Sequence, residues 1–211
     1  MQIQQHMELK AAIEARTSIR IFSDEKVDLN DIREMVRLAG LAPSVNNYQP
    51  WRYIAVLNRD LLNRMADVVT AKIDALPSSK SIAAKNVKKQ VTWFSTFFKD
   101  APALLALVTK PYVTVLENAV EMTHDEINRL RNYPDIQSAG ASIQNILLAA
   151  VDMDYGACWL SGPMFAREEL EKMLNIESPE KLLAFVVIGR ARAEHKPKIK
   201  PNLADSLEII E

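Results

Sequence analysis

One stretch in the second half of the chain, residues 135–153, most constrains what this sequence can fold into. It follows Pro134, and apolar residues extend around much of its circumference when it is drawn as a helix. These residues are Ile136, Ala139, Ile143, Leu147, Ala150 and Val151. A helix with so little polar surface has to be covered on several sides, so we expect it to be central. We also expect Gly156, which follows it, to stop the helix.

Short apolar runs alternate with longer amphipathic stretches in the rest of the chain. The apolar runs predict strands at 52–57, 103–109, 157–160 and 182–190. The amphipathic stretches predict helices at 6–16, 29–41, 60–76, 82–98 and 166–174. Asp28 is the expected N-cap of the second helix, and Val87, Val91, Phe94 and Phe98 lie near one face of the fourth. This alternation predicts a layered fold of helices and strands. The pattern of residues 111–133 is ambiguous, and only their second half favours a helix.

The composition limits the classes of partner and cofactor. The chain has 211 residues, 26 of them basic and 27 acidic, and lacks the basic excess typical of nucleic-acid binding. A single cysteine, Cys158, excludes an intrachain disulfide and a CxxC motif. The three histidines, His6, His124 and His195, lack the spacing of metal ligands, so we expect no metal site.

No stretch of the sequence predicts secretion or membrane insertion. The segment MQIQQHMELK has no basic region followed by an apolar core. The most apolar long segment, residues 143–153, is too short to span a bilayer and contains Gln144, Asn145 and Asp152. We therefore expect a cytoplasmic protein in a reducing environment, with neither a nucleic acid nor a membrane as partner.

The scarcity of glycine affects how this chain can bind phosphate. It has five glycines and contains neither GxGxxG nor GxxxxGKS, so side chains would have to bind any phosphate group. One candidate is the basic junction, which we define as Arg16, Thr17, Ser18 and Arg20 at a helix-to-strand boundary. Guanidinium groups bind phosphate in a bidentate manner. The alternative is a solvated turn with two surface arginines, which this segment alone favours.

A second basic cluster lies near the C-terminus. It consists of Lys196, Lys198 and Lys200, and an extended backbone would point the last two to one side. Its alternative is an ordinary charged tail, and the cluster alone favours the tail.

The proline loop, which we define as residues 42–51 (APSVNNYQPW), is rich in rigid and polar residues. Pro50 predicts an extended conformation for Gln49. The Asn and Gln side chains each offer a donor and an acceptor, which suits a planar polar ligand such as an isoalloxazine or pyrimidine edge. The alternative is a stiff connector whose polar groups satisfy the local backbone.

A third candidate is the segment ACWLSGP, residues 157–163. Small and turn-forming residues after a strand let backbone N–H groups approach a ligand closely, although an ordinary strand-to-helix loop would have the same composition. We expect Cys158 to pack as a buried apolar residue and not to act as a nucleophile, because no histidine lies near it in sequence.

Together these segments resemble the FMN-dependent nitroreductase family, over about residues 15–207. ARTSIRIFSDEKV is similar to the family's Arg-Arg-Ser-x-Arg segment, and LAPSVNNYQPWRYIAV to its Pro-Ser-x-x-Asn-x-Gln-Pro-Trp signature. DIQSAGASIQNILLAAVDMDYGACWLSG resembles the family's central dimer helix and the loop that follows it.

The resemblance implies an α+β fold in three layers, with a mixed, largely antiparallel sheet flanked by helices. It also implies one domain over residues 1–211 and an intertwined homodimer. The C-terminal arm, about residues 191–211, would be exchanged between the two subunits.

The resemblance further implies that FMN is the cofactor. The basic junction would bind its phosphate and ribityl chain, and Lys198 and Lys200 would close on the phosphate. Arg20 would in addition stabilise the anionic reduced flavin. Backbone amides around Leu160, Ser161 and Gly162 would face the ring near its N5.

In the family, the proline loop reaches a flavin that is bound mainly by the other subunit. The residues matched to those contacts are Pro43, Ser44, Val45 and Asn47. The loop would thus connect cofactor binding to dimerisation.

The implied function is an oxidoreductase in which NADH or NADPH reduces FMN and a small acceptor, such as a nitroaromatic or a quinone, is then reduced at the same face. The resemblance assigns no residue of this chain as an acid or base. The alternatives are reductive dehalogenation, oxygen-dependent flavin chemistry, a flavin-binding protein without turnover, and a helical interaction protein without a cofactor.

Overall fold

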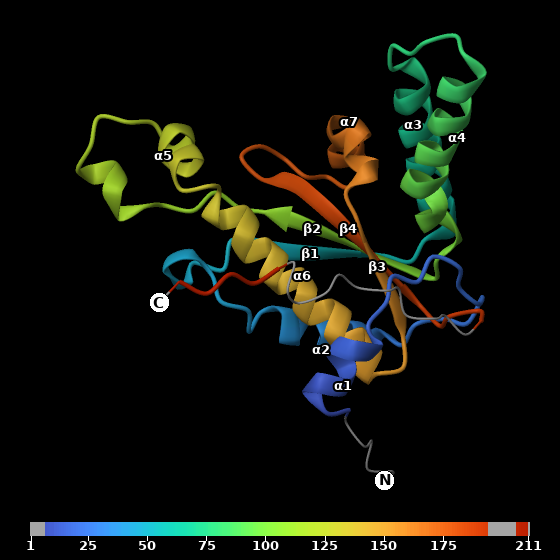
Figure 1. The fold of residues 1–211 in the computed structure, drawn as a ribbon, viewed down its shortest axis with the longest axis horizontal. Helices are drawn as coiled ribbons and strands as arrows, with labels where there is room; N and C mark the ends of the chain where they lie inside the picture. Colours follow the sequence, from blue (N-terminus) through green and yellow to red (C-terminus); the bar gives the residue numbers. More distant parts are fainter. Residues whose placement is uncertain (1–6, 194–205, 211) are drawn as a thin grey trace.

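The computed structural model describes residues 7–193 and 206–210, and in this part of the chain helices alternate with the strands of one sheet (Figure 1). The α-helices are α1 (Leu9–Ala15), α2 (Leu29–Ala39), α3 (Arg59–Ala75), α4 (Ile82–Thr96), α5 (His124–Leu130), α6 (Pro134–Asp152) and α7 (Arg167–Met173). The strands are β1 (Trp51–Val56), β2 (Ala103–Thr109), β3 (Gly156–Leu160) and β4 (Lys181–Gly189). Short 3-10 helices are η1 (Val45–Asn47), η2 (Phe97–Asp100), η3 (Val115–Asn118) and η4 (Gly162–Ala166).

The strand order in the sheet is β1-β2-β4-β3, and each neighbouring pair is antiparallel. Ser18 adds a parallel bridge to Ala157 on β3, and Phe22 an antiparallel bridge to Ala191. The prediction of a mixed, largely antiparallel sheet is therefore confirmed.

Strand β2 shows how the three layers are built, because its side chains alternate between two apolar clusters. Leu104 packs into a core with α3, η2 and α7, while Leu105 packs into a second core with α2 and α6. Figure 1 shows α2 and α6 on one side of the sheet, and α3, α4 and α7 on the other. The predicted α+β fold in three layers is confirmed.

Helix α6 has the predicted position and ends at Asp152, within one residue of the prediction, but a different residue stops it. Asp154, with φ 62°, ends the helix in a left-handed conformation. Its N–H donates to Val151 O at 3.0 Å, and the N–H of Tyr155 donates to Ala150 O at 2.7 Å, which is the Schellman arrangement. Gly156 is instead the first residue of β3, so the predicted stop at this glycine was wrong.

The predicted face of the fourth helix is divided in the structure. Phe98 is fully buried in the core, whereas Val87 and Phe94 are exposed. Helix α4 ends at Thr96, and the tighter turn of η2 redirects the chain, so that Phe98 points to a different side from Phe94. The exposed residues of this helix are therefore available to line a site.

No helix among residues 7–193 and 206–210 has the length and apolar character needed to cross a bilayer. Most of the predicted C-terminal arm, including Lys198 and Lys200, lies outside the described residues.

Gly156 provides a test of how the sheet edge is packed. A Cβ at this position would lie 2.6 Å from a side-chain carbon of Ile19, so Gly156→Ala should lower the free energy of unfolding by about 1–3 kcal/mol. Gly140→Ala is the control, because its Cβ would meet Trp159 at an ordinary 3.5 Å and alanine favours the helix. Urea unfolding measures both variants, and equal stability would contradict the packing described here.

Candidate functional site

The basic junction runs along the edge of β3. Ser18 pairs with Ala157, and the N–H of Ile19 donates to Ala157 O at 3.0 Å. Because alternate side chains of an extended segment point to opposite sides, this pairing separates the junction into two sets. Thr17 lines a hollow of about 780 Å³ together with Ile19, whereas Arg20 lines a different one.

The second hollow, of about 460 Å³, brings together two of the predicted segments. Arg20 meets Leu160, Ser161 and Gly162 at the end of β3 and the start of η4. Its apolar lining consists of Val91, Phe94, Phe97, Cys158, Trp159 and Phe165. We call this space the aromatic hollow.

Helix α4 orients Arg20. The guanidinium carbon lies 5.5 Å from the ring centre of Phe94, and Nη1 donates to Ser18 O at 3.3 Å. A guanidinium over an aromatic face gains a cation–π attraction. No carboxylate pairs with Arg20 in the described part of the chain, so its charge is available to an electron-rich or anionic ligand.

The turn after β3 packs directly on α4. A Cβ on Gly162 would lie 2.4 Å from Oγ of Ser95, which is only 2% exposed. Gly162 is therefore needed for the close approach of this turn to α4, whereas the predicted approach of its backbone N–H groups to a ligand stays a prediction. Cys158 is buried, as expected, although it also borders the hollow.

The proline loop is tight and left-handed at three positions. Asn46, Asn47 and Gln49 have φ values of 50°, 53° and 53°. The expected extended conformation of Gln49 was therefore wrong. Its N–H donates to Ser44 Oγ at 3.0 Å and its carbonyl accepts from the N–H of Trp51 at 2.8 Å, and these bonds offset the restriction that Pro50 imposes.

A polar stripe on α6, consisting of Ser138, Ser142 and Asn145, positions this loop and the helix before it. The N–H of Val45 donates to Ser138 Oγ at 3.0 Å. Ser142 Oγ donates to the carbonyl of Ala39 at 3.0 Å, and Asn145 Nδ2 donates to the preceding carbonyl at 3.1 Å. These carbonyls lie at the end of α2 and also accept from the N–H groups of Leu41 and Ala42, so the stripe adds a second bond to each and ties α6 to the start of the loop.

Within one chain the proline loop is separate from the aromatic hollow. Among the described residues that line this hollow there is none of Pro43, Ser44, Val45 and Asn47. In Figure 1 the loop between α2 and β1 is at the left, away from α4 and the end of β3. Within one chain, Arg20 and the turn at 160–162 therefore line the same hollow, and the proline loop lies elsewhere.

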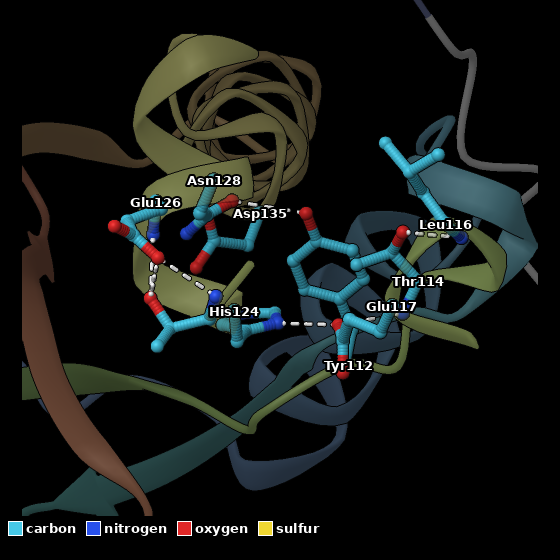
Figure 2. Close-up of polar contacts among 9 residues, drawn as sticks. Tyr112, Thr114, Leu116, Glu117, His124, Glu126, Asn128 and Asp135 are labelled. Carbon is cyan, nitrogen blue, oxygen red and sulfur yellow. Dashed lines mark hydrogen bonds and ion pairs between the residues drawn. The ribbon is translucent and has the colours of Figure 1, made fainter. Parts of the chain in front are cut away.

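The ambiguous segment 111–133 forms η3 and α5, so the predicted helix in its second half is confirmed. Figure 2 shows its polar contacts. Tyr112 donates to Asn128 Oδ1 at 2.9 Å, and Asn128 Nδ2 donates to Asp135 Oδ1 at 3.1 Å. This chain of bonds ties the segment to the start of α6.

His124 connects the two ends of the same segment. Its Nδ1 lies 2.8 Å from Glu117 Oε1, and this hydrogen bond is the main cause that lowers the pKa of Glu117. The ring of Tyr112 contacts His124 on one side and Tyr48 of the proline loop on the other, with centroids 4.9 and 6.3 Å apart. Tyr48 therefore joins the proline loop to the segment that follows β2.

Several residues of the aromatic hollow were not predicted to line a site. Phe94 and Val91 were assigned to a packing face, and Ser95 and Phe165 were not singled out. The signal that could have found them is the aromatic run WFSTFF at 93–98, which holds more large rings than one buried helix face can take.

Comparison with known proteins gives one family. The model of the nitroreductase family matches residues 13–190. A BluB-like flavoprotein from Clostridium difficile 630 has a solved structure with a TM-score of 0.84 and 31% identity, and the match covers 97% of this chain and 100% of that one.

Two further matches are named for two different activities. The structure of an FMN- and NADPH-dependent nitroreductase from Sphigopyxis sp. strain HMH aligns with a TM-score of 0.75 over 97% of this chain and 100% of that one, at 18% identity. An iodotyrosine deiodinase from Nematostella vectensis is 26% identical over 186 residues, which are 86% of this chain and 66% of the relative.

The contact between Tyr53 and the α6 stripe can be tested through stability. The two hydroxyl oxygens of Tyr53 and Ser142 lie 2.7 Å apart, and since Ser142 donates to Ala39, Tyr53 is the donor. Tyr53→Phe should cost about 1 kcal/mol and Ser142→Ala about 1–3 kcal/mol, and the double variant less than their sum because they share one bond. Urea unfolding gives these values, with Tyr133→Phe as an exposed control; strictly additive costs would contradict the bond.

The same tyrosine predicts a pH dependence. Burial is the main cause that raises the pKa of Tyr53 to about 12, from an ordinary value of about 10. Its contribution to stability is therefore fully present below about pH 10 and is lost as the pH rises toward 12. The stability difference between the wild type and Tyr53→Phe should shrink over this range in urea unfolding; a difference that stays constant would contradict the buried phenol.

Proposed function

The chain belongs to the nitroreductase family, and on this premise we propose that it is an FMN-dependent NAD(P)H oxidoreductase that reduces small electron-poor acceptors such as nitroaromatics and quinones. The observation that carries this proposal is the aromatic hollow, where Arg20 meets the turn at Leu160–Gly162. These two segments are separated by about 140 residues of chain and become one site only through the fold.

The residues around the aromatic hollow fit a flavin. Its volume lies within the range of small-molecule sites, and apolar rings form its walls with few polar groups among them. Arg16 and Ser18 alternate with Thr17 in the sequence, so an extended backbone would point them to the same side as Arg20, where they would suit a phosphate. FMN, when bound, supplies hydride acceptance from the nicotinamide and transfer of two electrons to the acceptor.

The chain's own residues would bind the flavin and influence its reduction. Arg20 would place a cation beside a bound flavin, which would favour the extra negative charge that reduction brings. Gly162 packs directly on Ser95 of α4, so the turn at Leu160–Gly162 is held in place before any ligand arrives. The aromatic walls would cover part of a bound flavin.

We also propose a homodimer that completes the site. Helix α1 exposes Leu9 at 67%, and Leu41, two residues after α2, is 68% exposed. Exposed apolar residues around a central helix favour coverage by a second copy. The proline loop, which lies apart from the hollow of its own chain, would then reach the flavin of the partner.

Reductive dehalogenation of a halogenated phenol is a second candidate, and it is favoured by the iodotyrosine deiodinase among the relatives. It uses the same cofactor site and differs only in the acceptor, so the hollow alone does not separate the two activities.

The purified protein should be yellow, with an absorption band at ~450 nm from the oxidised flavin, and NADH or NADPH should bleach it without oxygen. Recovery of the colour on adding a nitroaromatic or a quinone supports the first function. Recovery with iodotyrosine and release of iodide, without response to nitroaromatics, supports the second. A colourless protein that takes up no added FMN would refute both.

The assignment of the phosphate side can be tested by substitution. Arg16→Ala or Ser18→Ala should weaken FMN binding by about 10- to 100-fold, because the phosphate loses a charge-assisted or hydroxyl partner. Thr17→Ala is the matched control, since Thr17 lines the other hollow. Fluorescence titration with FMN measures all three, and equal affinities would remove Arg16 and Ser18 from the site.

A further inference from the structure

A second hollow, of about 600 Å³, adjoins the aromatic hollow and has a different chemical character. The two share Arg20 and Phe97, so they meet at these side chains. Arg59, from the start of α3, and Arg192, after β4, contribute further positive charge. We call this space the arginine hollow.

In the described part of the chain, the cations of the arginine hollow form no ion pair with the acidic residues beside them. Asp24 and Asp100 line the same space, yet no ion pair joins either to Arg59 or Arg192 in the described residues. Nη1 of Arg59 instead donates to the backbone carbonyl of Lys99, which orients its guanidinium group. An arginine without a carboxylate partner and with one N–H already fixed is well prepared to bind a phosphate.

An aromatic ring forms another wall. Trp93 is 47% exposed and lines the arginine hollow, and its indole stacks on Phe97 with centroids 5.7 Å apart and an interplanar angle of 29°. A supported ring with a free face binds a planar base by stacking. The carboxylates of Asp24 and Asp100 and the amide of Asn63 are acceptors for ribose hydroxyls.

From these features we infer that the arginine hollow binds the adenosine diphosphate half of the nicotinamide donor. The inference rests on the proposed function, in which the nicotinamide must reach the aromatic hollow. The other half of the dinucleotide then needs an adjoining space with cations for the diphosphate, acceptors for the ribose and a ring for the base. The arginine hollow offers all three and borders the aromatic hollow directly.

A groove between α3 and α4 is the competing anion site. It has a volume of about 420 Å³ and is lined by Lys85, Lys88 and Lys89. It shares no lining residue with the aromatic hollow, and Nζ of Lys88 is already bonded to two carbonyls at the end of α3. A donor bound there would have no continuous path to the site that it must reduce.

The test uses the FMN-loaded protein and two charge-removing variants, Arg59→Gln and Arg192→Gln. Calorimetric titration with ADP should show about tenfold weaker binding in each variant, while the FMN content stays at the wild-type level. Arg64→Gln, an exposed arginine of α3 that does not line the hollow, is the matched control and should bind ADP normally.

Flavin bleaching without oxygen gives a second readout. The half-saturating concentration of NADH and of NADPH should rise about tenfold in Arg59→Gln and Arg192→Gln, whereas the rate with 1-benzyl-1,4-dihydronicotinamide should be unchanged. This donor carries the reacting ring but has neither phosphate nor adenosine.

Three results would overturn the inference: wild-type ADP affinity in both variants, an equal loss with the benzyl donor, or loss of FMN. Weaker ADP binding in Lys88→Gln or Lys89→Gln instead would move the site to the groove between α3 and α4. A colourless protein that still binds ADP through Arg59 and Arg192 would refute the proposed function but leave the anion site in place.

Discussion

The pairing of the basic junction with β3 is the constraint on which the rest of the site depends. Ser18 and Ile19 are tied to Ala157 by main-chain contacts, and Gly156 makes room for the Ile19 side chain. Because the segment is extended, this single registration decides which residues face which hollow. A shift by one residue would exchange Thr17 with Ser18 and turn Arg20 away from the turn at 160–162. The fit of Ile19 against Gly156 thereby helps to decide which hollow Arg20 lines.

The central helix α6 fills the core and also holds the proline loop in place. Its apolar residues fill the core between the sheet and α2, while Ser138, Ser142 and Asn145 lie along one line of the same helix. Their bonds join α6 to the last two carbonyls of α2, which also accept from the N–H groups of Leu41 and Ala42, and to the N–H of Val45. The same bonds fix the start of a loop with three left-handed residues. A purely apolar helix would have packed as well but would have left the proline loop without a defined position.

Sequence periodicity located nearly every helix and strand, because long amphipathic helices and wholly apolar strands give strong signals. It failed where a tertiary contact overrode a local preference. Asp154 and not Gly156 ends α6, since Arg190 bonds to Asp154 and to the carbonyls of the helix end. Gln49 is left-handed although it precedes a proline, because Ser44 binds its N–H. Arg20 and the segment 160–162 were each indicated by sequence, but their meeting was implied only by a family resemblance. The aromatic residues of α4 that line the hollow were not predicted to do so. Residues 93–98 contain both buried and exposed rings, and the sequence pattern does not distinguish them.

The arrangement around Arg20 would let the proposed site bind two ligands with few charged groups. Arg20 lies between a space walled by aromatic rings and a space with further arginines, and it lines both. Stacking on Phe94 limits its movement, so its charge acts at the boundary in a fixed direction. Phe97 also lines both spaces. Its ring stacks on Trp93 and forms part of the wall of the aromatic hollow. A ligand that spans both spaces would therefore be aligned by side chains that are already ordered by packing, and little conformational entropy would be lost when it binds.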